Sequence, residues 1–232
     1  MAQAGGSCRV TSGAVPPTVV ELYTSEGCSS CPPADRWLST LKGKPDVLAM
    51  SFHVTYWDNL GWPDRFANAD YTARQYAIAH QNGSAQVYTP QVVVNGQDWR
   101  SWPRLPAAAT AAAAAAAKPA PQVTLAREGD LVTATVAAAP AGGRGPGKWA
   151  AYWAVLEDAH QSQVRAGENS GETLKHDHVV RLLKPVPAWA AADGARVQLT
   201  VSPGAPAFPR RVVLVVTDAQ TQQPLQAVAL GC

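Results

Sequence analysis

The sequence predicts an α/β domain over residues 14–118, followed by a mainly antiparallel, sandwich-like β domain over residues 119–232. In the first half, apolar strand-like runs alternate with helical patterns, as in α/β proteins with parallel strands. From residue 122 onward, short β-rich runs follow one another with Gly/Pro-rich joints and no convincing helix. That texture is typical of a sandwich. A hydrophobic fraction of 47% in 232 residues supplies enough core for one or two domains.

Strands and helices alternate in the first half. The run at residues 47–54 is apolar almost throughout, which indicates a strand buried on both faces. Helices are predicted over about residues 31–41 and from Asp64, as the N-cap, to about Gln81. The alanine-rich segment 105–118 is expected to be a docked final helix, with a helical linker as the alternative. The three expected strands are 18–24, 47–54 and 91–94.

The second half reads as strands joined by turns. Residues 127–130, Arg-Glu-Gly-Asp, lie between two alternating runs and predict a hairpin. The expected strands are 123–126, 131–136, 149–157, 178–183, 196–201 and 211–218.

Two cysteines separated by two residues, Cys28 and Cys31, lie between the first expected strand and the first expected helix. Such a pair closes a small disulfide or shares a metal. At a helix start, the first thiol is expected near unpaired backbone N–H groups and the positive end of the helix dipole. That setting favours the thiolate, the form that attacks disulfides. The position therefore favours redox chemistry.

The remaining cysteines, Cys8 and Cys232, lie near the two ends of the chain. Three pairings of four cysteines are formally possible. If Cys28 pairs with Cys31, a Cys8–Cys232 disulfide would tie the ends together, which requires an oxidising compartment. Two free buried thiols are the alternative.

The bulk properties exclude several classes of protein. The net charge is +2 and no basic run is longer than two residues, so nothing predicts nucleic-acid binding. No stretch reaches the roughly 18 apolar residues of a membrane helix. The small residues of segment 1–7 are expected to be what remains after a leader was removed and a start Met added. We therefore expect a periplasmic or secreted protein.

Four segments resemble the DUF1223 family of exported bacterial proteins of undefined function. They are residues 21–35 around the two cysteines, 52–62, 88–91 and 167–181. The resemblance implies a thioredoxin-like domain, with Pro90 in a cis-proline loop facing the dithiol, fused to a β-rich extension. Two features depart from an ordinary thioredoxin. No Trp precedes Cys28, and the dipeptide between the cysteines is Ser-Ser, so no redox potential can be carried over.

The first functional hypothesis is thiol–disulfide exchange of unknown direction, with no cofactor beyond the disulfide itself. Cys28, expected nearer to solvent, would attack a disulfide of a protein or a small molecule, and Cys31 would resolve the mixed disulfide. Pro90 would shape a groove for an extended substrate. An unidentified redox partner would restore the dithiol.

Other side chains are candidates around this site. His53, at the end of a central strand, either stabilises the thiolate and moves its proton or is a hydrogen-bonded core histidine. Thr89, Tyr56 and Trp57 are expected to line the substrate groove, although the two aromatics also fit simple packing. Two acids complete the set. Asp58 orients His53 or, as we favour, caps the next segment, and Glu26 tunes the thiol or, as we favour, is a solvated loop acid.

Two further hypotheses remain open. One is Cu(I) binding or delivery through Cys28, Cys31 and His53, because soft sulfur and imidazole ligands suit copper. His176 and His178, expected on one face of a strand, are at most a weak second site. The other is a non-catalytic interaction module that uses the β domain and the loop 167–171. That glycine-flanked acidic loop is also a candidate to fold over the dithiol and limit access.

Overall fold

The computed structural model describes residues 7–104, 120–140 and 147–232, and the fold is mostly β with few helices. The helix predicted over residues 105–118 lies outside this described part. Within it, no helix is long and apolar enough to cross a membrane.

The chain divides into two compact units. The CxxC unit consists of Val19–Pro106 and Leu156–Arg181. The flanking unit consists of Met1–Thr18, Ala107–Val155 and Leu182–Cys232. The sequence predicted a boundary between residues 118 and 119. The division into compact units differs from it because segment 156–181 groups with Val19–Pro106. Two long strands cause the difference, since each starts in one unit and ends in the other: β8 (Lys148–Glu157) and β11 (Val179–Ala190).

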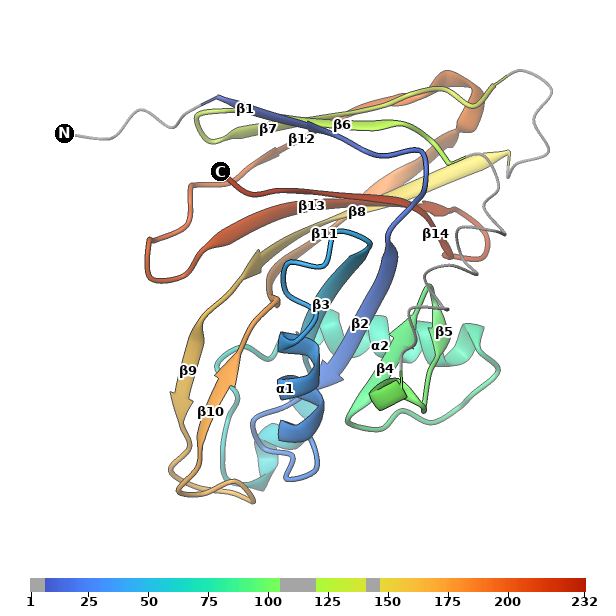
Figure 1. The fold of residues 1–232 in the computed structure, drawn as a ribbon. Helices are drawn as coiled ribbons and strands as arrows, with labels where there is room; N and C mark the ends of the chain where they lie inside the picture. The colour runs from blue at the N-terminus through green and yellow to red at the C-terminus, as the bar shows by residue number, and fades with distance from the viewer. Residues whose placement is uncertain (1–6, 105–119, 141–146) are drawn as a thin grey trace. The chain divides into compact units, whose positions relative to one another are not determined.

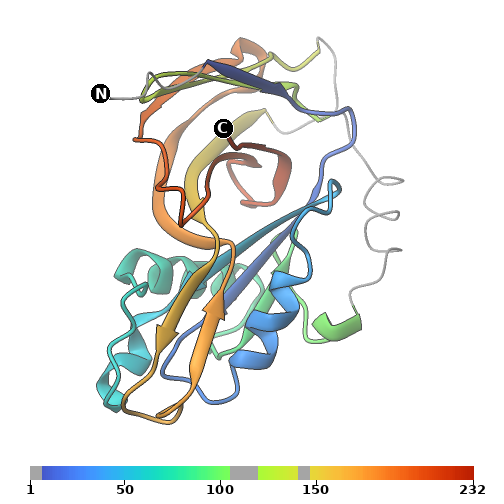
Figure 2. The same ribbon diagram turned by 60° about the vertical axis from the view of Figure 1, so that its left-hand side comes forward.

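The CxxC unit contains a mixed sheet in the order β11-β3-β2-β4-β5. Strand β11 pairs parallel with β3, whereas β2 and β4 pair antiparallel. A separate hairpin of β9 and β10 lies in the same unit, and β10 runs beside α1 (Figures 1 and 2). The elements are β2 (Thr18–Thr24), α1 (Pro32–Ser39), β3 (Val47–His53), a 3₁₀ turn (Thr55–Leu60), α2 (Ala69–Gln81), β4 (Gln91–Val94), β5 (Gln97–Asp98), β9 (His160–Gln163) and β10 (Thr173–His176).

Helices cover both faces of this sheet, which explains its continuous apolar strands. Every residue of β2 is buried, as expected for a strand covered on both faces. On one face, Ala34 and Leu38 of α1 pack against Ala49 of β3. On the other face, the ring of Phe52 lies 5.5 Å from that of Tyr71 in α2. Because side chains alternate along a strand, His53 falls on the α1 face with Ala49.

The two helices begin at different kinds of residue. Helix α1 has Cys31 as its N-cap and proline in its first turn, where a missing N–H costs nothing. Helix α2 begins at Ala69, with Asn68 as the N-cap accepting from the Asp70 amide at 2.8 Å. The prediction that Asp64 caps this helix is wrong. The Asp64 carboxylate instead accepts hydrogen bonds from buried partners described below.

The flanking unit is a sandwich of the four-stranded sheet β1-β6-β7-β12 and the strands β14-β13-β8-β11, which belong to one eight-stranded sheet, β14-β13-β8-β11-β3-β2-β4-β5, that continues into the CxxC unit. Inward-facing residues of both sheets, among them Leu125, Trp153 and Leu214, form one apolar core. Cys8 and Cys232 form a disulfide here, with their Cα atoms 6.6 Å apart. Strands β1 and β14 were not predicted, and β11 is longer than its predicted strand. The elements are β1 (Cys8–Thr11), β6 (Val123–Glu128), β7 (Leu131–Val136), β12 (Ala195–Thr200), β13 (Arg210–Asp218) and β14 (Pro224–Leu230), with parts of β8 and β11.

Candidate functional site

The CxxC motif is a closed disulfide on the turn between β2 and α1. Cys28 and Cys31 are bonded, with their Cα atoms 5.4 Å apart. Both cysteines are 0% exposed, whereas Ser29 and Ser30 between them are exposed. The expectation that Cys28 lies nearer to solvent is therefore wrong for the oxidised protein. A substrate or reductant reaches the sulfur atoms only when neighbouring residues move.

Two hydroxyl groups surround the Cys28 sulfur. The Thr89 Oγ1 donates to Cys28 Sγ at 3.3 Å, and the Ser30 Oγ lies at the same distance. A disulfide sulfur carries no hydrogen, so a hydrogen bond here uses the single Ser30 hydroxyl proton, which the Thr89 carbonyl oxygen, 3.5 Å from Ser30 Oγ, also accepts. The Trp57 Nε1 donates to Thr89 Oγ1 at 2.8 Å, which directs the Thr89 proton towards the sulfur. The Thr89–Pro90 peptide bond is cis, as the family resemblance implied.

The backbone N–H groups of this turn are largely engaged elsewhere. Pro32 and Pro33, at the start of α1, have no N–H. The Cys31 amide donates to the Cys28 carbonyl at 3.1 Å, and the Ser29 amide donates to a carboxylate oxygen of Glu168 at 3.0 Å. The expectation of unpaired amides around the first thiol is thus only weakly met. Side-chain hydroxyls are the donors that contact the Cys28 sulfur.

The loop 167–171 lies against the CxxC turn. Besides the Glu168 contact, the Asn169 Nδ2 donates to the backbone carbonyls of Glu26 at 2.8 Å and Cys28 at 3.0 Å. Asn169 is 6% exposed, so these bonds are shielded from water. Gly167 adopts a φ of +74°, and a Cβ there would meet the Leu60 carbonyl at 3.3 Å, so any other residue would strain the loop. Sequence reasoning placed the loop near the dithiol but did not identify Asn169.

Tyr56 and Trp57 take different roles. Trp57 reaches the dithiol through Thr89, as described. The Tyr56 hydroxyl donates to Gln75 Oε1 at 3.2 Å, on α2. Both aromatic side chains are half-buried. The structure therefore brings Thr89 to the Cys28 sulfur and Trp57 to Thr89, while the hydroxyl of Tyr56 bonds to Gln75 on α2.

His53 lies in a buried cluster of ionisable groups. It is 0% exposed, and its Nδ1 donates to Asp64 Oδ2 at 2.6 Å. Burial alone would lower the pKa of His53, but the Asp64 carboxylate outweighs it and raises that pKa. Burial opposes ionisation of Asp64 too, yet His53 and two backbone amides lower the Asp64 pKa to about 2. Asp58 accepts from the amide of Asp64 at 3.0 Å; because Asn68 is the N-cap of α2, this contact lies in the preceding loop and caps no helix.

Glu26, two residues before Cys28, is not the solvated loop acid that we expected. It is 0% exposed and accepts from Trp62 Nε1 at 2.8 Å and from His176 Nε2 at 3.1 Å. Burial would raise the pKa of Glu26, but these hydrogen bonds outweigh it and lower that pKa. The partner histidine lies 150 residues away in the sequence, so no local pattern announces it.

His176 and His178 are also buried, at 3% and 2% exposure, which corrects the solvated strand edge that we favoured. They do not share a strand face either, because β10 ends at His176 and His178 lies in the following turn, with a φ of 59°. The ring of His176 instead lies 5.0 Å from that of His53.

Asp35 completes the cluster. It lies one helical turn after Cys31 on α1, is 7% exposed, and accepts from Thr24 Oγ1 at 3.0 Å. Burial raises the Asp35 pKa, against the attraction of His176 and His53. Asp35, His53 and His176 each offer a ligand atom within 4.8 Å of the others, and neither cysteine belongs to this group. The structure thus places His53 with Asp35 and His176, which does not support copper binding by Cys28, Cys31 and His53.

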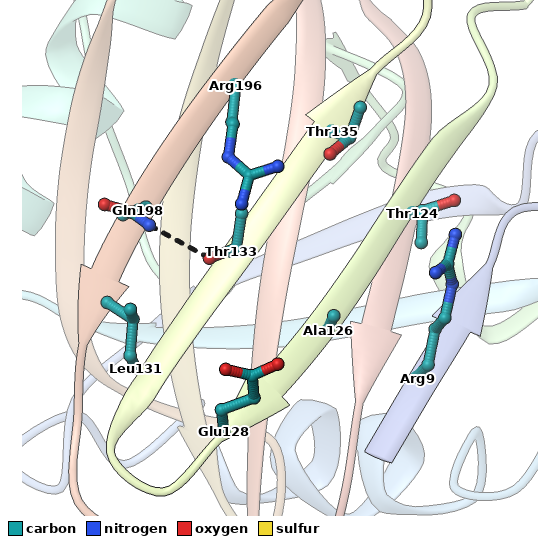
Figure 3. A pocket seen from close by; sticks show the side chains of 9 residues that line it. All are labelled: Arg9, Thr124, Ala126, Glu128, Leu131, Thr133, Thr135, Arg196 and Gln198. Carbon is teal, nitrogen blue, oxygen red and sulfur yellow. Dashed lines mark hydrogen bonds between the residues drawn. The ribbon is translucent and has the colours of Figure 1, made fainter. Parts of the chain in front are cut away.

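A separate hollow of about 280 Å³ lies on the sheet β1-β6-β7-β12 of the flanking unit (Figure 3). Its lining is polar and includes Arg9, Glu128 and Arg196. The amide of Gln198 donates to Thr133 Oγ1 at 3.1 Å across two of its strands. No cysteine or histidine lines it. Its chemistry is therefore unrelated to that of the dithiol.

Comparisons with known proteins agree with the motifs. This chain is similar to a protein from Agrobacterium tumefaciens whose crystal structure is known. The two share 29% sequence identity and a TM-score of 0.68, and the match covers 93% of this chain and 94% of that chain. HBP35 of Porphyromonas gingivalis shares the fold, at 14% identity and a TM-score of 0.57, over 94% of this chain and 76% of that one. No curated protein matches the sequence. The family model described as "Protein of unknown function (DUF1223)" matches residues 19–217, and this chain therefore belongs to the DUF1223 family.

Proposed function

We propose that this protein is a thiol–disulfide oxidoreductase whose redox-active pair is Cys28 and Cys31. The observation that carries the proposal is the environment of the Cys28 sulfur. Two hydroxyl donors, Ser30 and Thr89, lie 3.3 Å from it at the start of a helix. After reduction, the same donors would stabilise a thiolate, because hydrogen bonds to the charged form favour it. No side-chain hydroxyl contacts the Cys31 sulfur among the described residues, and we assign Cys31 as the resolving residue.

The exchange proceeds in two steps. The Cys28 thiolate attacks one sulfur of a substrate disulfide, forming a mixed disulfide, and the other substrate sulfur leaves as a thiolate. The Cys31 thiolate then attacks the Cys28 sulfur and releases the second substrate thiolate. Two electrons pass from the dithiol to the substrate, and the Cys28–Cys31 disulfide is restored. An external thiol reductant drives the next cycle; the reverse sequence oxidises a substrate dithiol.

A thioredoxin-like character of the CxxC unit supports this chemistry. The unit places the CxxC between a central strand, β2, and α1, with Thr89 and Pro90 directly before β4. The sheet order β11-β3-β2-β4-β5 sets β4 next to β2, which brings the Thr89 loop to the dithiol. We assign Thr89, Trp57 and, further out, Tyr56 to the edge of a groove for an extended substrate. Pro90 belongs to the same edge.

Access to the dithiol depends on the loop 167–171. The sulfur atoms are buried in the oxidised protein, and we infer that the opening that exposes them breaks the bonds that Asn169 and Glu168 make to the backbone of the CxxC turn. Such local opening costs far less than global unfolding. The loop thereby makes the disulfide selective for partners that displace it. We assign the protein to the periplasm or the cell exterior, since its two disulfides persist only in oxidising compartments.

The test is the reduction of insulin disulfides by dithiothreitol, followed as turbidity, with and without the protein. We expect wild type to accelerate the reaction and Cys28→Ser to abolish the acceleration. The matched control is Cys8→Ser/Cys232→Ser, which removes the other disulfide and should retain the acceleration. No acceleration by wild type, or equal loss in the control while it remains folded, would overturn the assignment.

A further inference from the structure

The strongest unexplained feature of the CxxC unit is the group Asp35, His53 and His176. Three segments far apart in the sequence bring it together: α1, the end of β3 and the end of β10. The three side chains offer ligand atoms within 4.8 Å of one another. If all three separations were at this 4.8 Å limit, a point equidistant from the atoms would lie about 2.8 Å from each. Movements of about 0.7 Å per side chain would therefore bring them to a typical zinc–ligand distance of about 2.1 Å.

Each histidine forms a hydrogen bond through only one ring nitrogen among the described residues, and His176 Nδ1 lies 3.9 Å from Asp35 Oδ1. His53 Nδ1 bonds to Asp64, and His176 Nε2 bonds to Glu26. The other nitrogens, His53 Nε2 and His176 Nδ1, are buried without a hydrogen-bond partner among the described residues. In a neutral imidazole that donates from one nitrogen, the second carries a lone pair. Buried polar atoms are almost always paired, so two such nitrogens in one cluster call for a common partner.

The carboxylates behind the histidines match the outer shell of metal sites. Metal-binding histidines commonly donate their second N–H to a carboxylate, which fixes the tautomer and the ring orientation. Here Asp64 and Glu26 occupy that position, at 2.6 Å and 3.1 Å. Phe66 lies against both imidazole rings, with centroid distances of 5.1 and 5.6 Å, and closes the site with an apolar wall.

Charge also favours a cation. Glu26, Asp35 and Asp64 are three carboxyl groups buried around the two imidazoles, and no lysine or arginine among the described residues forms an ion pair with them. A divalent cation would favour the ionised form of these carboxyl groups and offset part of their negative charge. Two imidazoles and one carboxylate are a ligand set that zinc accepts with a fourth, exchangeable ligand.

The geometry points to a Zn²⁺-binding site formed by Asp35, His53 Nε2 and His176 Nδ1, distinct from the two cysteines. The site ties α1, β3 and β10 together directly behind the CxxC turn. Asp35 lies one helical turn after Cys31, and the His176 partner Glu26 lies two residues before Cys28. Bound metal would hold the turn in place whether the cysteines are oxidised or reduced.

The first experiment uses the wild-type protein with both disulfides intact, so that no thiolate can bind metal. Because the ligands are buried, Zn²⁺ is offered both to the native protein and during refolding from denaturant, and the bound metal is counted after dialysis. We expect one Zn²⁺ per chain, a melting temperature that rises with Zn²⁺, and Co²⁺ substitution with ligand-field absorption but no sulfur charge-transfer band. If the protein binds no metal, either when native or when refolded with Zn²⁺, the two histidine nitrogens do not form a metal site and the proposal fails.

Variants then locate the site. Asp35→Asn and His176→Gln should lose the bound Zn²⁺, and Asp64→Asn should weaken it by about 10–100-fold, as removal of an outer-shell partner does. The matched control is His160→Gln, because His160 is also buried, bonds to a carboxylate at 2.9 Å and lies against Phe66. It should retain full occupancy.

A final variant separates this proposal from metal binding by the cysteines. Cys28→Ser/Cys31→Ser should keep one Zn²⁺ per chain while losing every thiol-dependent activity. Loss of metal in this double variant, or in His160→Gln as much as in His176→Gln, would overturn the assignment. Near-ultraviolet circular dichroism confirms that each variant is folded. Because metal content is counted independently of insulin reduction, failure of either proposal leaves the other standing.

Discussion

Asn169→Ala should expose the dithiol without touching either cysteine. The Asn169 amide donates to two carbonyls, those of Glu26 and Cys28, at 2.8 and 3.0 Å. These bonds hold the loop 167–171 against the CxxC turn. Alanine removes both donors and leaves the contact of Glu168 with the Ser29 amide in place. The loop is then expected to open more often, and reduction of the Cys28–Cys31 disulfide should accelerate.

The magnitude follows from the two lost bonds. A buried hydrogen bond contributes about 1 kcal/mol net, so the closed loop loses about 2 kcal/mol. Since 1.4 kcal/mol is a factor of ten, the open population rises by about 30-fold. If reduction passes through this opening, its rate at a fixed dithiothreitol concentration rises by the same factor.

The assay follows reduction by quenching with an alkylating reagent and mapping the modified cysteines by mass spectrometry. The Cys8–Cys232 disulfide serves as an internal reference. The matched control is Asn82→Ala, because Asn82 Nδ2 also donates to two carbonyls, at 2.8 and 2.9 Å, at the end of α2. It should lose stability but change the rate less than threefold. Rates in Asn169→Ala within threefold of the control would refute the view that this loop limits access.

Three further predictions follow from other contacts. In the chain-entropy model the Cys8–Cys232 disulfide, with a separation of 224 residues, contributes about 5 kcal/mol; replacing both cysteines by serine should lower the denaturant-measured unfolding free energy by several kcal/mol, and a change below about 1 kcal/mol would contradict this. Thr89→Val removes one donor to the active sulfur, so alkylation of the reduced protein at neutral pH should slow by about tenfold; an unchanged rate would argue against thiolate stabilisation by hydroxyls. Burial raises the pKa of Tyr71 and of Tyr88 to about 12, so the folded state favours their neutral phenols. The contribution of these two tyrosines to the free energy of unfolding should be complete below about pH 10, the pKa of an unfolded tyrosine. It should be lost as the pH rises towards about 12, because the unfolded chain then ionises first. Ultraviolet titration checks this, and ionisation of both near pH 10 in the folded protein would contradict it.

Short sequence patterns predicted the part of the site that is formed by residues close together in the chain. The CxxC on a strand-to-helix turn, the strands β2, β3 and β4, and the approach of Thr89 all follow from short patterns and from the family resemblance. These elements are specified by residues close together in the chain. The prediction of an N-cap failed because the predicted capping residue, Asp64, forms hydrogen bonds with other partners. Asp64 has the chemistry of an N-cap, but His53 and the Glu26 amide bind its carboxylate, and Asn68 caps α2 instead.

Long-range contacts account for the remainder. An acid in a loop is usually solvated, and Glu26 departs from that default only because His176 and Trp62 reach it. His176 lies in the segment 156–181, which belongs to the CxxC unit although the chain before and after it belongs to the flanking unit. The strands β8 and β11 connect this segment to the flanking unit. No periodicity or composition of the sequence predicts that this segment packs against the CxxC turn. The same segment contains Asn169, whose contacts with Glu26 and Cys28 depend on that packing.

The most direct test of the central claim is to identify the attacking sulfur. Reduced Cys31→Ser and Cys28→Ser variants, each with one thiol of the pair left, are mixed with oxidised glutathione at neutral pH, and mixed disulfides are timed by intact mass. The account predicts rapid formation at Cys28, which has the hydroxyl donors, and at least tenfold slower formation at Cys31. Equal rates at the two cysteines, or no mixed disulfide at Cys28, would contradict it.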